Sequence, residues 1–450
     1  MEDVIVAIAT TVGISALNVI KLSGKDSIKV VNKIFLGKDL TKVDGNTINY
    51  GYIVDDKEKI DEVLVSVFLS PKTYTKENVV EINSHGGYAA TNKILELCLL
   101  NGARLAQPGE FLKRAFLNGR IDLIEAESIS DLINSKTQYS RKLSMSGLEG
   151  KLSKLIKNIR KEIITILASI EVNIDYPEYE DEEILTNKLI ETKCKKIQED
   201  IESLLSTAKD GKIIKKGITV GLVGAPNVGK SSILNALLEE NKAIVTDIPG
   251  TTRDKVEGTI ILKGIEVHLI DTAGIRETTD KVELIGVSKS YETIENADVL
   301  LNIYDSSRQT TKEDIKILST LDKKKTIIVL NKKDLPLKFN KEILKKFKVI
   351  EVSALNNENI EEIKNLIISN FNIENIEKDF TLLSNARHIA SMKQALNIVK
   401  DINKDIKKST PIDLIEISLK NLLYVLSEIT GENYNAEILD EIFSKFCLGK

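Results

Sequence analysis

A phosphate-binding loop is encoded by Gly224-Ala-Pro-Asn-Val-Gly-Lys-Ser231, which has the spacing G-x-x-x-x-G-K-S. The apolar run 218–223 before it is typical of a buried strand, and residues 232–238 after it are typical of a helix. In that context the glycines let backbone N–H groups turn toward a polyphosphate, and the helix N-terminus favours the same anion. We expect Lys230 to contact the β- and γ-phosphates and Ser231 to bind Mg²⁺. A chance glycine-rich turn is the alternative, and the motifs that follow disfavour it.

The next two motifs suit the metal and the γ-phosphate. Residues 246–254 contain Thr252, whose hydroxyl could bind Mg²⁺ while the segment folds over the γ-phosphate. Asp271 follows an apolar run and lies where a carboxylate near the Mg²⁺ shell belongs. The N–H group of Gly274, three residues later, can contact the γ-phosphate. These positions predict a nucleoside triphosphate site with a bound magnesium ion.

Two later motifs indicate guanine as the base. Residues 331–334 read Asn-Lys-Lys-Asp, and the Asp334 carboxylate can accept two hydrogen bonds from the N1–H and 2-amino groups of guanine. Adenine offers neither, so a buried carboxylate beside it would be left unpaired. Residues 353–355 suit a loop that contacts the base. Each motif follows a predicted strand, at the edge where open α/β sheets bind ligands, so we expect the chain to bind GTP.

The nucleotide-site residues predicted by these motifs are spread over the loops after the strands. They are Asn227, Val228, Gly229, Lys230, Ser231, Ser232, Thr246, Asp247, Ile248, Pro249, Gly250, Thr251, Thr252, Asp271, Thr272, Ala273, Gly274, Asn331, Lys332, Asp334, Ser353 and Ala354.

Ile275 stands where many small GTPases carry the glutamine that orients the attacking water. An isoleucine side chain cannot orient water. Either hydrolysis is therefore very slow, or another group positions the water and another charge stabilises the transition state. Asn227 supplies an extra oxygen ligand beside the phosphates, and a monovalent cation bound there could replace part of an arginine finger.

The composition is that of a chain of two or three globular domains: 450 residues, 42% hydrophobic and 29% charged. A net charge of −4 excludes a global basic field for nucleic acid or anionic lipid. Cys98, Cys194 and Cys447 are widely spaced, which fits a reducing cytoplasm and disfavours a disulfide framework. We expect no signal peptide, no membrane span and no lipidation of the C-terminus, because its last residues depart from a prenylation motif.

The first part of the chain mixes β-rich runs with helical patterns. Residues 5–9, 17–22 and 63–69 are typical of strands and residues 89–100 of a helix, and we expect one or two helices in all. This pattern predicts an α+β domain over residues 1–118.

Helical periodicity governs residues 119–215 and 374–450, whereas residues 216–373 alternate strand and helix patterns. The alternation predicts a doubly wound α/β P-loop domain. Because helical regions lie on both sides, we expect it to be inserted in an all-α domain that its two flanking parts form together. The strands expected in the insert are residues 218–223, 267–270, 299–304, 326–330 and 349–352.

Several other features have a simple structural interpretation. Cys194 lies on an apolar helical stripe and is expected in the core. The acidic run 175–183 is expected to be solvated surface. Lysine clusters at 151–161, 193–196 and 212–216 are interpreted as polar helix faces, with RNA contact as the less favoured alternative.

Read together, the motifs resemble the MnmE (TrmE) family of tRNA-modifying GTPases. Beyond the GTPase motifs, residues 108–123 resemble the signature that follows the family's N-terminal domain, and Phe446-Cys-Leu-Gly-Lys450 resembles its C-terminus. The resemblance covers the whole chain. It implies an N-terminal folate-binding and dimerisation domain, a helical domain and an inserted GTPase domain. The motifs within the GTPase region are residues 224–232, 243–254, 271–277 and 282–283.

The resemblance also implies a potassium-activated GTPase. It implies Mg²⁺ bound by Ser231 and Thr252, and a potassium-dependent pairing of two GTPase domains that activates hydrolysis. Glu283 falls where the family places the glutamate that helps to orient the water; from the residues alone, an exposed helix residue would be preferred. The implied potassium ligands are Asn227, Thr246, Ile248 and Thr251, and the implied catalytic residues are Glu283, Lys230, Thr252 and Gly274.

The folate site that the resemblance implies falls on Lys21, Glu81, Arg120 and Lys450. A carboxylate can pair with the amino and ring N–H groups of a pterin, and cations suit the glutamate tail of a tetrahydrofolate derivative, 5-formyl- or 5,10-methylenetetrahydrofolate. The family usually has arginine in place of Lys21 and lysine in place of Arg120, and these cations are not equivalent. Residues 10–15 also depart from the family's glycine-rich loop. Cys447 is interpreted either as a reactive thiol or as a structural cysteine.

The function implied is GTP hydrolysis coupled to tRNA modification. With an FAD-dependent partner enzyme of the MnmG (GidA) type, in a heterotetramer, the homodimer would add a carboxymethylaminomethyl group to C5 of the wobble uridine, the one-carbon unit coming from methylenetetrahydrofolate. A ribosome-assembly or regulatory GTPase is the alternative, since it shares the GTPase motifs. A folate-dependent transferase with a vestigial GTPase is disfavoured by the intact Lys230, Ser231, Asp271 and Asp334.

Overall fold

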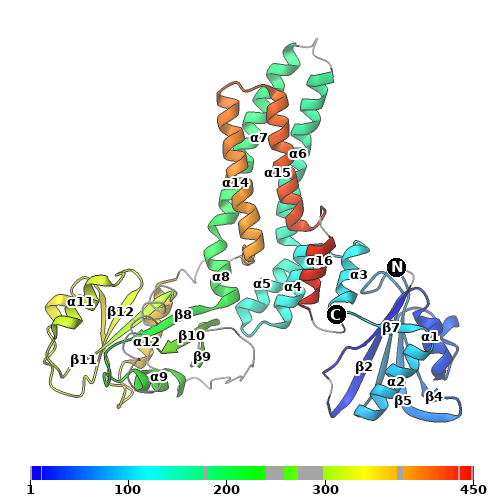
Figure 1. Ribbon diagram of the computed structural model, residues 1–450, viewed down its shortest axis with the longest axis horizontal. Helices are drawn as coiled ribbons and strands as arrows, with labels where there is room; N and C mark the ends of the chain where they lie inside the picture. Colours follow the sequence, from blue (N-terminus) through cyan, green and yellow to red (C-terminus); the bar gives the residue numbers. More distant parts are fainter. Residues whose placement is uncertain are drawn as a thin grey trace. The chain divides into compact units, whose positions relative to one another are not determined.

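The structure is a computed structural model of the chain, and it describes residues 3–11, 13–175, 180–239, 258–271, 297–371, 379–433, 436–446 and 449. The chain forms two compact units, which are treated separately below (Figure 1). The first unit comprises Met1–Ser130, Ser153–Glu182 and Thr410–Lys450, and the second comprises Asp131–Leu152 and Glu183–Ser409.

The first unit is built on a seven-stranded sheet in the order β3-β4-β5-β6-β2-β1-β7. Its strands are antiparallel except for β7, which runs parallel to β1. The strands are β1 (Val4–Ile8), β2 (Ser15–Ser23), β3 (Phe35–Leu36), β4 (Thr47–Asp55), β5 (Glu58–Phe68), β6 (Val79–Gly86) and β7 (Ala103–Leu105). The α+β prediction is therefore confirmed, and the strands expected at 5–9, 17–22 and 63–69 are β1, β2 and part of β5.

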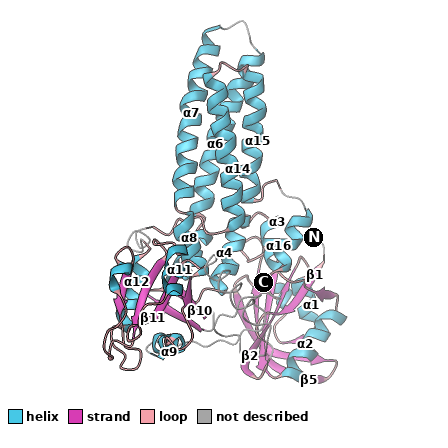
Figure 2. Ribbon diagram, turned by 60° about the vertical axis from the view of Figure 1, so that its left-hand side comes forward, coloured by secondary structure: helices cyan, strands magenta, loops and turns pink. Residues whose placement is uncertain are grey.

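Helices α1 (Ser27–Ile34) and α2 (Tyr88–Leu100) cover one face of this sheet (Figures 1 and 2). Side chains alternate along β5 and β6, so Val65 and Ile82 are buried under the helices while Leu64 and Asn83 point to the other face. A third helix, α3 (Glu110–Leu117), also lies in this region, where at most two helices were expected. Half of the residues of the short α1 are β-branched, a composition that also suits a strand, which explains why it was missed.

Helices complete the first unit: most of α4 (Leu123–Ile133) and α6 (Lys151–Asp175), together with α15 (Ile412–Thr430) and α16 (Ala436–Ser444). Helix α16 packs against α3, with the rings of Phe443 and Phe116 centred 6.0 Å apart. Gly109 begins α3 in a left-handed conformation, and a Cβ there would lie 2.3 Å from the carbonyl oxygen of Phe443. Only glycine permits this close approach.

The second unit contains a six-stranded sheet in the order β13-β12-β11-β8-β10-β9, parallel except for the edge strand β9. Helices α9 and α12 contribute to the core on one face, and α11 to the core on the other. The doubly wound α/β prediction is confirmed, and only β9 was not expected. The elements are β8 (Ile218–Val223), α9 (Lys230–Glu239), β9 (Gly258–Leu262), β10 (Ile265–Asp271), β11 (Val299–Asp305), α11 (Lys312–Thr320), β12 (Thr326–Asn331), β13 (Lys348–Glu351) and α12 (Ile360–Ser369).

Four helices outside the sheet belong to this unit: α5 (Gln138–Leu148), α7 (Glu180–Ser206), α8 (Ala208–Lys216) and α14 (Ala386–Lys407). Helices α7 and α14 lie side by side, joined by an ion pair between Glu202 and Lys400 at 2.9 Å. Cys194 of α7 is fully buried, as expected, and burial raises the pKa of its thiol to about 12. None of the helices that the structure describes is long and apolar enough to cross a membrane.

Candidate functional site

The predicted phosphate-binding loop connects β8 to α9 in the second unit. Asn227 and Gly229 have positive φ angles of 63° and 95°, which turn the backbone between strand and helix. A Cβ on Gly224 would lie 2.4 Å from the carbonyl oxygen of Ile303 on β11. The loop is thus pressed against its neighbouring strand, and this close approach explains the first glycine of the motif.

Lys230 begins α9 and is buried, with 8% of its surface exposed. Its ammonium group donates hydrogen bonds to the carbonyl oxygens of Gly224 at 2.7 Å and Ala225 at 3.1 Å. Burial lowers the pKa of Lys230, against the opposing pull of the Asp271 carboxylate at the end of β10. The side chain is therefore folded back over the loop, where a phosphate oxygen can replace the two carbonyls as acceptor.

Asn331, at the end of β12, joins the loops of the predicted site. Its Nδ2 donates to the Val228 carbonyl oxygen at 2.9 Å, and its Oδ1 accepts from the N–H of Ala354 at 3.1 Å. The side chain is 3% exposed, so both hydrogen bonds are shielded from water. A Cβ on Gly229 would lie 2.2 Å from its Nδ2, so the second glycine is required for this contact.

Two of the three charged residues of the guanine motif, Lys332 and Asp334, are held by neighbours. Ser353 donates a 2.5 Å hydrogen bond to Oδ1 of Asp334, and Lys332 forms an ion pair with Asp305 at 2.6 Å. Asp334 is exposed in the structure. Asp305 was not predicted, although it directly follows an apolar run just as Asp271 does. The parallel strands bring these residues to one edge of the sheet.

Much of the predicted site lies outside the described residues. Asn227, Val228, Gly229, Lys230, Ser231, Ser232, Asp271, Asn331, Lys332, Asp334, Ser353 and Ala354 are described, with Ser231 and Ser232 exposed in the first turn of α9. Thr246, Asp247, Ile248, Pro249, Gly250, Thr251, Thr252, Thr272, Ala273, Gly274, Ile275 and Glu283 are not, nor are Cys447 and Lys450.

A second candidate site lies in the first unit. Lys21 on β2 and Glu81 on β6 are directly paired in the sheet register. The Lys21 ammonium lies 4.1 Å from the ring centroid of Tyr74, and the Arg120 guanidinium lies 4.6 Å from the same ring. Two of the four implied folate residues thus lie against one aromatic ring, and a third, Glu81, is the cross-strand neighbour of Lys21. Tyr74 was not predicted, because a single tyrosine in a loop gives no signal until the fold places it between two cations.

Burial raises the pKa of the Tyr74 hydroxyl, although the nearby Arg120 charge opposes this shift. Phe111 adds a second ring 5.2 Å from the Lys21 ammonium. Two aromatic rings, two cations and one carboxylate can accommodate a flat heterocycle with an anionic tail.

These features define a P-loop nucleotide-binding domain: a strand, a glycine-rich loop and a helix in succession, with Asn-x-x-Asp and Ser-Ala loops at the same edge of the sheet. The chain matches the family models "GTP-binding protein TrmE N-terminus" over residues 4–120 and "MnmE helical domain" over residues 123–447. The chain belongs to the MnmE (TrmE) family. It is thus a multidomain protein with a TrmE N-terminal domain, a helical domain and a P-loop GTPase domain, as predicted.

Curated relatives match along the whole chain. The "tRNA modification GTPase MnmE" of Ligilactobacillus salivarius is 48% identical over 455 residues, covering 100% of this chain and 98% of the relative. The protein of the same name from Streptococcus thermophilus is 49% identical over 450 residues, with the same coverage. The matches thus extend over the N-terminal, helical and GTPase regions alike.

Solved structures match in part. Era of Aquifex aeolicus is 30% identical, with a TM-score of 0.26. The match covers 34% of this chain and 56% of the Era chain. The G domain of the FeoB iron transporter of T. maritima is 28% identical, with a TM-score of 0.26. The match covers 34% of this chain and 98% of the FeoB chain. TM-scores this low define neither the fold nor the activity of this chain.

Proposed function

We propose that the chain hydrolyses GTP and couples hydrolysis to the modification of tRNA. The observation that carries the GTP assignment is the Asn331 side chain, which links the phosphate-binding loop at Val228 to the base loop at Ala354. Asp334, held by Ser353, then presents a carboxylate to the two guanine donors. A site joined in this way binds phosphates and base together.

The described residues suit the magnesium-nucleotide complex. The hydroxyl of Ser231 and the carboxylate of Asp271 are hard oxygen donors on neighbouring loops, since β8 and β10 are adjacent in the sheet. We assign Ser231 and Thr252 as ligands and Asp271 as the carboxylate beyond them. When bound, Mg²⁺ neutralises charge on the β- and γ-phosphate oxygens. Lys230 adds a buried cation that contacts those oxygens directly.

Potassium activation is part of the proposal. The left-handed conformation of Asn227 supports it, because this residue is set apart from the helix that follows and lies beside the phosphate position. Thr246, Ile248 and Thr251 complete the proposed potassium site. Glu283 orients the attacking water in place of the missing glutamine.

The turnover of GTP by the purified protein tests these assignments. With Mg²⁺ present, we expect marked stimulation in potassium over sodium buffer, and loss of that stimulation in Asn227→Ala. An arginine finger contributes roughly 10³–10⁵ in rate, so a cation that replaces it has a large effect. Equal, slow rates in both buffers would contradict potassium activation. For the base, Asp334→Asn is expected to shift preference from GTP toward xanthosine triphosphate.

The tRNA reaction proposed is addition of a carboxymethylaminomethyl group at C5 of the wobble uridine, in the cytoplasm, with an FAD-dependent partner enzyme of the MnmG type. Membership of the MnmE family supports it. The cluster of Lys21, Glu81, Arg120 and Tyr74 supports a tetrahydrofolate as the one-carbon donor, with Lys450 as a further contact. Loss of the modified uridine on deletion of the gene is expected, and an unchanged tRNA nucleoside profile would refute the assignment.

A homodimer through the N-terminal domain is also proposed. The face of the first sheet opposite α1 and α2 exposes apolar side chains: Leu17 (61%), Ile48 (68%), Tyr50 (59%) and Leu64 (46%). The register aligns Tyr50 with Leu64 across β4 and β5, so these side chains form one patch. Such a patch favours burial against another surface, and a second copy supplies a matching one. Sedimentation of the purified chain tests this.

The division into residues 1–118, 119–215, 216–373 and 374–450 remains part of the proposal.

The alternative function, a ribosome-assembly GTPase, has no use for the residues gathered around Tyr74. Co-sedimentation with ribosomal subunits, unaffected by free tRNA, would favour it.

A further inference from the structure

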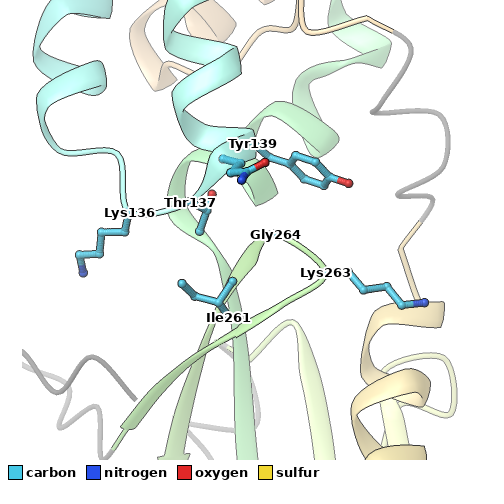
Figure 3. A pocket seen from close by; sticks show the side chains of 7 residues that line it. Lys136, Thr137, Tyr139, Ile261, Lys263 and Gly264 are labelled. Atoms are coloured by element: carbon cyan, nitrogen blue, oxygen red, sulfur yellow. The ribbon is translucent and has the colours of Figure 1, made fainter. Parts of the chain in front are cut away.

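A hollow of about 410 Å³ lies in the second unit, where the turn between β9 and β10 meets the beginning of α5 (Figure 3). None of its lining residues belongs to the nucleotide site described above. They are Lys136, Thr137, Gln138, Tyr139, Ile261, Lys263 and Gly264. The hollow therefore requires its own explanation.

The turn that borders the hollow places a lysine at its tip. Leu262 pairs with Ile265, so Lys263 and Gly264 form a two-residue turn with φ angles of 45° and 79°. Such turns favour asparagine before glycine, because a lysine in the left-handed region is strained. Gly264 packs on Tyr139, whose ring carbons would lie 3.3 Å from a Cβ at this position. The strained position thus holds an exposed cation, next in sequence to the glycine that packs on an aromatic ring.

Cations around the hollow fall into two groups. Lys136 is paired with Glu266 at 2.9 Å, and Lys215 with Asp131 at 2.6 Å. Among the residues that the structure describes, Lys263 has no carboxylate partner. Lys142 also has none within those described ranges. The paired lysines join helices to the sheet or to one another, whereas the other two remain available to a ligand.

One of the two available lysines, Lys142, lies near the Tyr139 ring, and the other, Lys263, precedes the glycine that packs on it. The Lys142 ammonium lies 6.0 Å from the ring centroid of Tyr139 and 5.5 Å from that of Phe380. In Figure 3 the ring of Tyr139 and the side chain of Lys263 extend to one side of the hollow and Lys136 to the other. Ile261, 40% exposed, adds apolar surface. Cations next to aromatic and apolar surface suit a chain of phosphates that carries flat bases.

We propose that this hollow, together with the neighbouring Lys142 on α5, is an RNA contact, in which Lys142 and Lys263 bind backbone phosphates of the tRNA. The inference rests on the proposed role in tRNA modification and assigns part of the surface that this role requires. A protein partner fits less well, because protein interfaces place aromatic residues and arginine at their centre and are depleted in lysine. With a net charge of −4 for the chain, RNA attraction has to come from a local group of cations such as this one.

The test compares RNA binding by the wild-type chain and by K142A/K263N. Asparagine is used at the turn because it accepts the left-handed conformation, so the hairpin is retained. The control is K312A/K316A, which removes two exposed lysines from α11 and changes the net charge equally. The probe is an unmodified tRNA transcript with a uridine at the wobble position, titrated at several KCl concentrations.

Each lost phosphate contact lowers the slope of log K against log [salt] by about 0.7 for a single strand. Two contacts therefore correspond to a slope change of about 1.4, or to about 25-fold weaker binding at 0.1 M KCl. We expect this loss in K142A/K263N only, with GTP turnover equal to that of the wild type. Retention of wild-type affinity and slope would overturn the inference and leave the proposed function intact.

Two other results separate the remaining possibilities. If K142A/K263N binds RNA normally but no longer binds the FAD-dependent partner enzyme, the hollow is a protein docking site and the RNA assignment is wrong. If the wild-type chain with normal GTP turnover binds no tRNA at any salt concentration, the role in tRNA modification fails together with the inference.

Discussion

The contact between Gly229 and Asn331 predicts that two damaging substitutions partly cancel. In Gly229→Ala the new methyl group would lie 2.2 Å from Nδ2 of Asn331, so the amide has to leave its position. In Asn331→Ala the amide is absent from the start. The double variant therefore contains no clash, and only the backbone strain of alanine at a φ angle of 95° is added to the loss of the amide.

The magnitude follows from the bonds that are lost. Without the amide of Asn331, the Val228 carbonyl and the Ala354 N–H are left unsatisfied, at about 1–2 kcal/mol each, so Asn331→Ala costs about 2–4 kcal/mol. Gly229→Ala displaces the same amide and adds about 1–2 kcal/mol of backbone strain, for a total of about 3–6 kcal/mol. The double variant should cost about 3–6 kcal/mol, not the 5–10 kcal/mol given by addition.

The assay is hydrogen exchange by mass spectrometry over a urea series, read on peptides from β8 and β12. These peptides report on the GTPase sheet separately from the rest of a multidomain chain, which does not unfold in one step. A coupling free energy of about 2–4 kcal/mol is expected between the two sites. Additivity within about 0.5 kcal/mol would refute the inferred contact.

Three further predictions concern single sites. Ser353→Ala should weaken discrimination between GTP and ITP, measured by competition binding, because the Asp334 carboxylate loses its 2.5 Å bond. Glu110 is partly buried, which alone would raise its pKa, but bonds from two arginines outweigh this and lower the pKa. Its stabilising contribution, present above pH about 4.5, should vanish as pH falls through the lowered pKa, and thermal melts of Glu110→Gln should show a shallower acid dependence. Cys98 and Cys194 should resist iodoacetamide at pH 8 until urea is added, since burial raises the pKa of each thiol to about 12.

The strands and helices that carry the nucleotide site follow directly from the sequence, because apolar periodicity and the motif spacing indicate the same elements. The run 218–223 is β8, and the helical periodicity on either side of the GTPase region is found in helices such as α7 and α14. Edge strand β9 escaped notice since a five-residue strand with one exposed face has a weak pattern.

Contacts made by folding could not be predicted in this way. Asn331 was assigned to the nucleotide site, but nothing in the sequence indicated that its side chain contacts Val228 and Ala354, which lie 103 and 23 residues away in sequence. Tyr74 belongs to no motif. It becomes part of the candidate folate site only because the fold brings Lys21 of β2 and Arg120, which follows α3, next to its ring. Sequence identifies residue types, whereas these roles depend on distances between distant segments.

The expected border at 215/216 is a border in sequence and not in packing. One buried cluster contains residues from both sides of this border: Leu143 of α5, Ile213 and Ile214 of α8, and Ile218 and Val220 of β8. The N-terminal ends of the central strands are therefore packed into these helices, while their C-terminal ends carry the nucleotide loops.

Strand β10 connects the two ends most directly. It presents Asp271 at the nucleotide edge and, about 17 Å away at 3.3 Å per residue, Glu266, which is paired with Lys136 beside the hollow. A strand that is hydrogen-bonded on both sides does not shorten or bend easily, so a displacement of Asp271 along β10 is carried to the Glu266–Lys136 pair. The nucleotide site and the hollow therefore lie near opposite ends of one strand.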